Sequence, residues 1–409
     1  MARLEDICEI LDSRRIPITA SDRVSGPYPY YGANGVQDYV NDYIFDDELV
    51  LLAEDGGNFG SKERPIAYRV SGKCWVNNHA HVLKPRAVID VDYICYALMF
   101  YDVSSLVNGA TRQKLTQADM RKMEIPMRSM AEQRRIIMQL KAATKVISAR
   151  KQQLDKLDDL IKARFVEMFG DVIHNNLGWQ QYMFSDIAAS RLGKMLDAKQ
   201  QTGNHRFPYL ANFNVQWFRF ELGNLNEMDF DEEDQKEFAL RDGDLLVCEG
   251  GEIGRCAVWH NDIQPCFFQK ALHRVRCDMG VVLPDYLARW FQYNCEHGGF
   301  ASIEGAKATI AHLPGAKLKV LQVVVPPIDL QKQFITFVAQ IDKSKFAVQK
   351  SLEETQKHKG RLSSMPKTQK RIFRVKPKGA LWILRMLYSA YIEKGEPKCY
   401  IRFINDGRA

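Results

Sequence analysis

The sequence predicts an α+β protein in which two domains of mixed strands and helices are joined by two long helices that pair with each other. Three observations lead to this fold class. A long charged stretch near the middle of the chain carries a narrow apolar seam, and a second stretch of the same kind begins about 200 residues later. The intervals before the two stretches repeat the same order of features, as an internal duplication would produce.

The first long helix is predicted from Ser129 to Phe169. Ser129 and Glu132 have the spacing of a capping box, and Gly170 is a suitable C-cap glycine. Apolar or small residues recur at spacings of four and three, with a break at Arg150: Ile136, Leu140, Ala143, Ile147, Leu154, Leu157, Ile161, Phe165 and Met168. So narrow a seam between charged flanks is typical of a coiled coil. A helix of about 39 residues is roughly 58 Å long and needs a partner to bury its seam.

The chain offers that partner after its second proline boundary. Ile125-Pro126 precedes the first helix and Val325-Pro326 precedes the second, an offset of 200 that also relates Gln133 to Gln333. The second seam is weaker and consists of Phe334, Phe337, Ile341, Val348 and Leu352. The alternative is two unrelated surface helices, but the matched spacing favours a duplicated unit whose helices pair.

Each domain is expected to contain buried strands, tight glycine turns and one amphipathic helix. In the first, Asn34-Gly35 predicts a turn, residues 48–53 a buried strand before Gly56-Gly57, and residues 93–101 a helix. In the second, the corresponding features are a strand over 245–248 before Gly250-Gly251 and a helix over 286–293.

Composition is that of a folded protein, with 46% hydrophobic and 26% charged residues. No window of about 18 apolar residues predicts a membrane span, and the N-terminus lacks an apolar signal core. The nine cysteines are scattered and form no C-x-x-C pair, so we expect neither a zinc site nor a disulfide framework, and a reducing cytoplasm is the simplest compartment. A net charge of +7 permits nucleic-acid binding without requiring it.

Catalytic motifs are not found in the sequence. There is no G-x-x-x-x-G-K-[ST] loop and no N-P-P-[FYW] or D-P-P-[FYW] tetrapeptide, which is the signature of amino-methyltransferases. Asp244 and Glu249 are better interpreted as strand-end carboxylates than as a nuclease pair. His79, His81 and His273 could contact bases or simply belong to strands, and metal binding is not expected because no cysteine or carboxylate cluster accompanies them.

Residues 1 to about 356 resemble the specificity (S) subunit of type I restriction-modification systems. The resemblance rests on residues 30–35 (Tyr-Tyr-Gly-Ala-Asn-Gly), residues 193–196 (Gly-Lys-Met-Leu), the paired proline boundaries, and Glu132-Gln133 at the start of the long helix. It implies two target-recognition domains, each reading half of a split site on double-stranded DNA, with the two helices antiparallel between them. Two methyltransferase subunits would dock on the chain, nuclease or translocase subunits could join, and S-adenosylmethionine would bind the methyltransferase partners, leaving this chain non-catalytic and without a cofactor. Lys332 in place of the acid of Glu132-Gln133 departs from the pattern.

The resemblance divides the chain into five segments: 1–128 and 171–326 as target-recognition domains, 129–170 and 327–360 as spacer helices, and 361–409 as a basic tail without an assigned role. DNA recognition needs loop-mounted donors to phosphates and base edges. The candidates are Tyr30, Tyr31, Asn34, Lys62, Arg64, Arg112, Gln113, Lys114, Arg255, Lys270, Lys307 and Thr309. An alternative function is a two-lobed coiled-coil scaffold that binds only protein.

Overall fold

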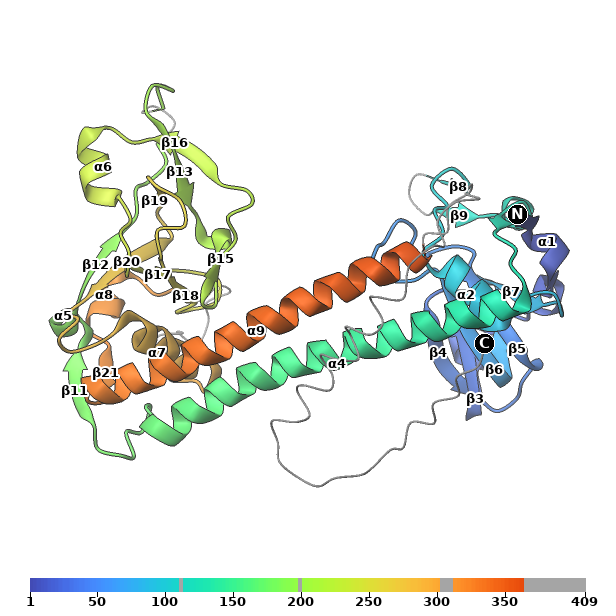
Figure 1. Ribbon diagram of the computed structural model, residues 1–409, viewed down its shortest axis with the longest axis horizontal. Helices are drawn as coiled ribbons and strands as arrows, with labels where there is room; N and C mark the ends of the chain where they lie inside the picture. Colours follow the sequence, from blue (N-terminus) through green and yellow to red (C-terminus); the bar gives the residue numbers. More distant parts are fainter. Residues whose placement is uncertain (110–112, 198–200, 302–311, 364–409) are drawn as a thin grey trace, which may run out of the picture. The chain divides into compact units, whose positions relative to one another are not determined.

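A six-stranded sheet forms the centre of the first domain (Figure 1). The computed structural model describes residues 1–109, 113–197, 201–301 and 312–363. The strand order is β2-β7-β5-β6-β3-β4, with β3 and β6 parallel and the other neighbours antiparallel. The strands are β2 (Cys8–Ile10), β3 (Ser25–Gly32), β4 (Gly35–Val40), β5 (Phe45–Ala53), β6 (Ala67–Val76) and β7 (Ala80–Pro85). The predicted apolar run at 48–53 is the second half of β5, which is buried from Leu49 to Ala53 between β6 and β7.

Helix α2 (Val91–Met99) covers part of this sheet and corresponds to the predicted helix over 93–101. Asp90 is its N-cap, and its carboxylate accepts a hydrogen bond from the Asp92 backbone N–H at 2.9 Å. Tyr93, Ile94 and Leu98 pack into one core with strand residues of β5. The remaining short elements are β1 (Ala2–Arg3), α1 (Leu4–Ile7), β8 (Val107–Asn108), β9 (Lys114–Leu115), α3 (Gln117–Arg121) and β10 (Glu124–Ile125), with single 3₁₀ turns at Asp12–Arg14 and Ala20–Asp22.

The second domain divides the equivalent strands between two sheets. One has the order β12-β20-β17-β18 and the other β16-β13-β19. Their strands are β12 (Ala188–Leu192), β13 (Arg206–Leu210), β16 (Asn226–Asp229), β17 (Leu245–Cys248), β18 (Cys256–Val258), β19 (Phe267–Phe268) and β20 (Leu272–Cys277). Two further pairs are β11 (Gln180–Met183) with β21 (Gln322–Val325) and β14 (Val215–Gln216) with β15 (Arg219–Phe220). The helices are α5 (Phe184–Ile187), α6 (Glu232–Phe238), α7 (Pro284–Glu296) and α8 (Gly315–Lys319), with a 3₁₀ turn at Asn212–Asn214.

The first long helix, α4 (Met130–Phe169), has the ends that the sequence predicts. The Ser129 hydroxyl accepts from the Glu132 backbone N–H at 3.3 Å, and the Glu132 carboxylate accepts from the Ser129 N–H at 3.1 Å, which confirms the capping box. The Ser129 hydroxyl also lies 2.9 Å from the Glu132 carboxylate, and the hydrogen bonds from this hydroxyl and from the Ser129 N–H hold the pKa of Glu132 below its usual range. Gly170 has φ of +71°, and its N–H donates to the Val166 carbonyl, so it terminates the helix in the left-handed conformation that glycine adopts at least cost.

The C-terminal half of α4 pairs with α9 (Ile328–Ser363), and the two helices run antiparallel (Figure 1). Phe165 meets Phe334 with ring centroids 5.6 Å apart, and further along the pair Asp158 accepts a hydrogen bond from Lys345 at 2.5 Å. Residue numbers fall along α4 as they rise along α9, which fixes the antiparallel direction. The predicted α+β class with two long paired helices is therefore confirmed.

The chain separates into two units within α4. Residues 1–143, together with the end of α9 from residue 357, form one unit, and residues 144–356 form the other. Early residues of α4, such as Ile137, pack in the core of the first domain, whereas Ile161, Phe165 and Phe169 pack in the core of the second. A single helix thus contributes to both hydrophobic cores.

A buried glutamine joins each long helix to its own domain. The Gln133 amide oxygen accepts from the Asp90 N–H at 2.8 Å, and its nitrogen donates to the carbonyls of Val88 at 3.2 Å and Arg128 at 3.0 Å. In the other unit, the Gln331 oxygen accepts from a backbone N–H, and its nitrogen donates to two carbonyls, at 2.9, 3.0 and 2.8 Å. Neither glutamine is exposed to solvent. We call these two sets of contacts the glutamine joints.

The glutamine joints correct the predicted offset between the two copies. Gln133 corresponds to Gln331, whereas Gln333 is exposed, so the copies are related by 198 positions rather than 200. Leu330 therefore takes the place of Glu132, and Lys332 is not its counterpart. The sequence suggested the wrong pairing because Pro326-Pro327 offers two prolines and the segment contains two glutamines. Only burial distinguishes the structural glutamine from the surface one.

Replacing Gln331 by Ala should lower the free energy of unfolding by about 1–3 kcal/mol, because one backbone N–H and two carbonyls lose their buried partner. Gln333→Ala is the matched control and should change it by less than about 0.5 kcal/mol. Denaturant unfolding measures both effects, and faster hydrogen exchange at the Leu283 amide would locate the loss. Equal effects of the two substitutions would contradict the assignment of Gln331.

Candidate nucleic-acid interface

In the first domain, turns from four parts of the chain meet at one end of the strands of the sheet. Asn34 donates its side-chain amide to the Gly56 carbonyl at 2.9 Å. Asp55 forms an isolated β-bridge with Lys114, and its carboxylate lies 2.7 Å from the His79 ring nitrogen Nδ1. We call Asn34, Asp55, Gly56, His79 and Lys114 the first rim.

The second domain has an equivalent arrangement with other side chains. Asn212 donates to the Gly250 carbonyl at 3.0 Å, Gly250 bridges to His312, and the Ala271 carbonyl accepts from the Glu249 N–H at 2.9 Å, as the His79 carbonyl does from the Glu54 N–H. We call Asn212, Gly250, Ala271 and His312 the second rim. The backbone frame is repeated, whereas the chemistry that it presents is not.

In each domain, the residue that follows the last rim residue is held by two hydrogen bonds, which we call the clamp. The Leu115 N–H donates to the Glu54 carbonyl at 2.7 Å, and the His81 ring nitrogen Nε2 lies 2.9 Å from the Leu115 carbonyl. In the second domain, Leu313 makes the same two contacts with Glu249 at 2.6 Å and with His273 at 3.0 Å. His81 and His273 are fully buried. Both histidines therefore hold backbone in place, as the alternative interpretation of the sequence allowed.

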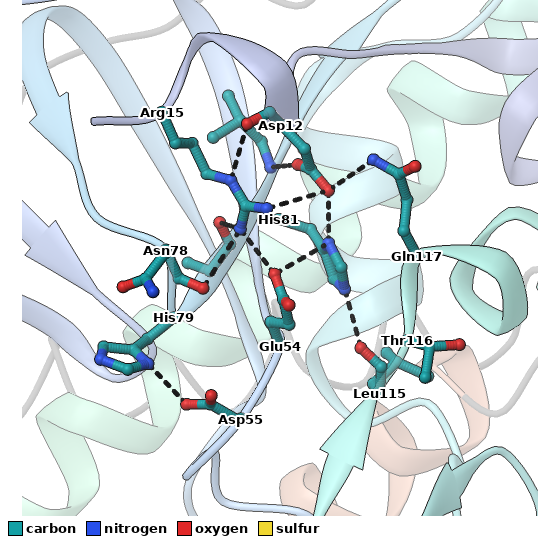
Figure 2. Close-up of polar contacts among 12 residues, drawn as sticks. Asp12, Arg15, Glu54, Asp55, Asn78, His79, His81, Leu115, Thr116 and Gln117 are labelled. Atoms are coloured by element: carbon teal, nitrogen blue, oxygen red, sulfur yellow. Dashed lines mark hydrogen bonds and ion pairs between the residues drawn. The ribbon is translucent and has the colours of Figure 1, made fainter. Parts of the chain in front are cut away.

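The first clamp is embedded in a buried network of charges (Figure 2). The Asp12 carboxylate lies 2.6 Å from Nδ1 of His81 and accepts from the Val82 N–H at 2.8 Å. Arg15 donates to Glu54 at 2.6 Å and lies 3.6 Å from Asp12. Although Asp12, Glu54 and His81 are close enough to share a cation, the Arg15 guanidinium already lies against both carboxylates and supplies the compensating charge.

These contacts set the protonation states of the buried carboxyl groups. Burial alone would raise the pKa of Asp12, but the hydrogen bond and charge of His81, the Val82 N–H and the Arg15 charge outweigh it and lower that pKa. The pKa of Glu54 is lowered in the same way, against burial, by Arg15 and the Lys114 ammonium. In the second domain, burial lowers the pKa of His273, so its ring favours the neutral form and donates through Nε2–H to Leu313.

The structure divides the predicted contact residues into three groups. Those exposed on the loops are Asn34, Lys62, Arg64, Gln113, Lys114 and Lys270. Tyr31 is half-buried against Tyr68, and Arg255 is 18% exposed because its guanidinium donates to Asn212. Tyr30 is only 1% exposed, with its hydroxyl on the Ile18 backbone, so its ring serves the core and leaves no surface for a ligand. Arg112, Lys307 and Thr309 lie outside the described residues, as does the tail from residue 364.

Asn212, His312 and His79 of the rims were not in the predicted contact set. His312 occupies the bridge position of Lys114, and Asn212 makes a contact like that of Asn34 but one residue earlier in the turn, so neither is evident from the sequence. His79 was interpreted as either a base contact or a strand residue, and its proximity to Asp55 depends on the β-sheet pairing. An Asn-Gly or Gly-Gly dipeptide predicts a turn, but it does not predict which residues lie next to that turn in the folded protein.

The remaining reactive groups serve the fold. Asp244 is 2% exposed and accepts from Arg276 at 2.7 Å, which makes it a buried ion pair, as expected of a strand-end carboxylate. The eight cysteines within the described residues are free thiols, and burial raises the pKa of Cys8 and Cys74 to about 12. Such thiols are poor nucleophiles at neutral pH. Among the described residues, no helix combines the length and apolar character that crossing a bilayer requires.

The sequence comparisons show what the chain is similar to. Residues 1–158 match the family model described as the type I restriction modification DNA specificity domain. A putative type I restriction enzyme specificity subunit from Haemophilus influenzae is 27% identical over 342 residues, covering 82% of this chain and 85% of that protein. The N-terminal part of the chain thus matches the type I specificity domain, and most of the chain is similar to a putative type I specificity subunit.

Solved structures of specificity subunits share the fold of this one. The S subunit from M. genitalium aligns with a TM-score of 0.54 over 90% of this chain and 96% of that chain, at 12% identity. A chain from a structure of type I restriction-modification complex assembly and conformational transition aligns with a TM-score of 0.55 over 88% of this chain and 94% of that chain, at 14% identity. At such low identity the backbone frame is retained while most side chains differ. This agrees with the contrast between the two rims of the present chain.

The Asp12 network should make the first domain sensitive to acid. Because the pKa values of Asp12 and Glu54 are lowered in the folded state, their contribution is present above the ordinary carboxyl range near pH 4 and is lost as pH falls through the lowered values. Asp12→Asn should cost about 3–5 kcal/mol at pH 7 and should flatten the dependence between pH 5 and 2.

Thermal unfolding followed across that pH range measures both effects. Asp46→Asn, in an exposed part of β5, is the control and should preserve the wild-type profile. A variant at Asp12 that keeps the full acid sensitivity of the wild type would show that this network does not supply it.

Proposed function

We propose that this specificity subunit reads an asymmetric, bipartite site on double-stranded DNA, with each domain reading one half. The observation that carries the proposal is the pair of rims: the same backbone frame is built twice and presents different groups. Recognition loops on a rigid scaffold are how proteins commonly combine stable folds with variable binding. Two frames with identical side chains would instead favour two identical half-sites.

The differences between the rims concern groups that distinguish bases. Asp55, His79 and Lys114 in the first rim correspond to Gly250, Ala271 and His312 in the second. Carboxylate, imidazole and ammonium groups donate to or accept from different base edges and phosphates, whereas glycine and alanine offer only backbone and a methyl group. Asymmetry of the DNA site follows from this substitution of chemistry at matched positions.

We further propose that the subunit is non-catalytic and that two methyltransferase subunits, which would bind S-adenosylmethionine, dock on it, with nuclease or translocase subunits able to join. The contacts described above support this: the buried carboxylates, histidines and thiols are committed to ion pairs, backbone clamps and cores. The exposed candidates Arg64, Lys114 and Lys270 are suited to DNA contact, and Arg112, Lys307 and Thr309 remain in the proposed set. For each, a base-edge contact should be worth about 1–3 kcal/mol.

The test is a domain exchange in the assembled methyltransferase complex. Replacing residues 1–128 by the corresponding domain of another specificity subunit should change one half of the methylated sequence and preserve the other, as sequencing of methylated genomic DNA would reveal. A simultaneous change of both halves would contradict independent reading. Assembly with partner proteins but without sequence-specific DNA binding would favour the protein-binding scaffold instead.

The long helices should set the length of the unspecified gap between the halves. Four residues inserted between Lys151 and Asp159 add about 6 Å of helix, and DNA rises about 3.4 Å per base pair, so the gap should lengthen by about one to two base pairs. The bases in each half should stay the same because their readers are unchanged. The measurement is the methylated motif of the insertion variant.

An insertion of the same length after Asp42, in the exposed turn between β4 and β5 of the first domain, is the control and should leave the gap unaltered. An active helix-insertion variant with the wild-type gap would argue against the helices as a ruler. Altered bases in either half would contradict the separation of reading from spacing.

A further inference from the structure

His79 is held in a fixed orientation at the turn between β6 and β7. Its N–H donates to the Asn77 side-chain oxygen at 2.8 Å, and its carbonyl accepts from the Glu54 N–H at 2.9 Å. Its ring nitrogen Nδ1 lies 2.7 Å from the Asp55 carboxylate, which is itself only 17% exposed. Backbone and ring are therefore both fixed before any ligand arrives.

The second ring nitrogen of His79, Nε2, is free to contact a ligand. The His79 side chain is 35% exposed, and within the described part of the chain its Nε2 has no hydrogen-bond partner. Figure 2 shows the ring beside Asp55, with its second nitrogen directed away from the Arg15 and His81 network. When one imidazole nitrogen is engaged by a carboxylate, the tautomer and direction of the other are set. The pair is thus arranged to present Nε2 outward.

His79 lies among residues that we propose to contact DNA. Asp55, which orients it, is bridged to Lys114, and Gly56, the next residue, accepts from Asn34. An outward Nε2 on this rim is within the same surface as an exposed amide and an exposed ammonium. A contact here would extend the proposed set by a residue for which the sequence left both a base contact and a strand position open.

The second domain supplies an internal comparison. At the matched positions, Ala271 replaces His79 and Gly250 replaces Asp55, so both members of the pair are missing together. The buried clamp histidines, His81 and His273, are by contrast present in both domains. The second rim forms the same backbone frame without such a pair, so the pair is not required to build the frame.

We propose that His79, oriented by Asp55, is a DNA contact that helps to specify the first half-site. The inference rests on the proposed function, since it assigns a reader within one of the two domains. Imidazole Nε2 can donate to guanine or phosphate oxygens, or accept from the exocyclic amino groups of adenine and cytosine. At the matched position of the second rim, Ala271 offers no imidazole.

The test uses the full chain assembled with its methyltransferase subunits. His79→Ala removes the contact, His79→Gln keeps a polar group of similar reach, and Asp55→Ala releases the ring from its fixed direction. His174→Ala is the matched control, because His174 also pairs with an aspartate, Asp171, at 2.6 Å but lies just after α4 and away from both rims. Readouts are the methylated motif, the affinity for cognate DNA and for DNA altered in either half, and the melting temperature.

His79→Ala should weaken binding of cognate DNA roughly 5- to 150-fold, with His79→Gln recovering part of the loss and Asp55→Ala losing less than His79→Ala. Relaxed bases confined to the first half identify a base-edge contact, and a uniform loss across sequences identifies a phosphate contact. Either result supports the proposal when the melting temperature and the His174→Ala control stay at the wild-type level.

Unchanged affinity and motif in His79→Ala would overturn the proposal, as would a loss explained entirely by a lower melting temperature. In both cases a wild-type complex that still reads two independent halves leaves the proposed function intact. A wild-type complex without sequence-specific binding would instead remove the proposed function, and with it the premise of this inference.

Discussion

The glutamine joints are the constraint on which the rest of the structure depends. A helix as long as α4 has only a narrow seam, so its own burial does not fix its direction from the domain that precedes it. Gln133 and Gln331 fix the direction of the helices, because the buried amide of each forms hydrogen bonds with backbone groups of the adjoining domain. An unpaired amide in such a place would be costly, so each joint allows one geometry and excludes others close to it. Rotation of a helix about its axis would break three bonds at once.

Packing at the far end of α4 adds a second restraint of another kind. Phe165 and Phe169 form an aromatic cluster with Tyr286 and Phe334, with ring centroids 5.0 to 5.8 Å apart. Stacked and edge-to-face rings favour particular approaches, although less strictly than hydrogen bonds do. The joint therefore specifies direction, and the cluster adds hydrophobic burial. Separation of the two roles explains why the second seam can be weak in sequence and still pair.

The two rims likewise combine a shared structural contact with different surroundings. The clamps at Leu115 and Leu313 use one backbone bond and one histidine, and they are nearly identical in length. Around that repeated element, the first domain has a charged network with Arg15, whereas the second relies on apolar burial and a neutral histidine. Because the clamp is the same in both domains while the residues around it differ, exposed side chains can change without loss of the backbone arrangement. This is the physical basis for one fold serving two different half-sites.

The sequence by itself determined the elements whose signals are local. The Ser129 capping box, the Gly170 terminus, the turn at Asn34-Gly35 and the seam of α4 all follow from neighbouring residues and were predicted correctly. Tertiary structure decided whatever depends on burial or on contacts between distant segments. It selected Gln331 over Gln333, because two glutamines in one helical turn differ only in which faces the core.

The tertiary structure likewise buries Tyr30, so that its ring is not available for DNA contact, and places His79 next to Asp55. An aromatic residue in a turn-rich stretch is equally suited to core and surface, and strand pairing alone decides between them. A histidine and an aspartate 24 positions apart become a pair only when two turns meet at one sheet edge. Local propensity fixes elements, whereas sheet pairing and burial fix which of their side chains are free to bind.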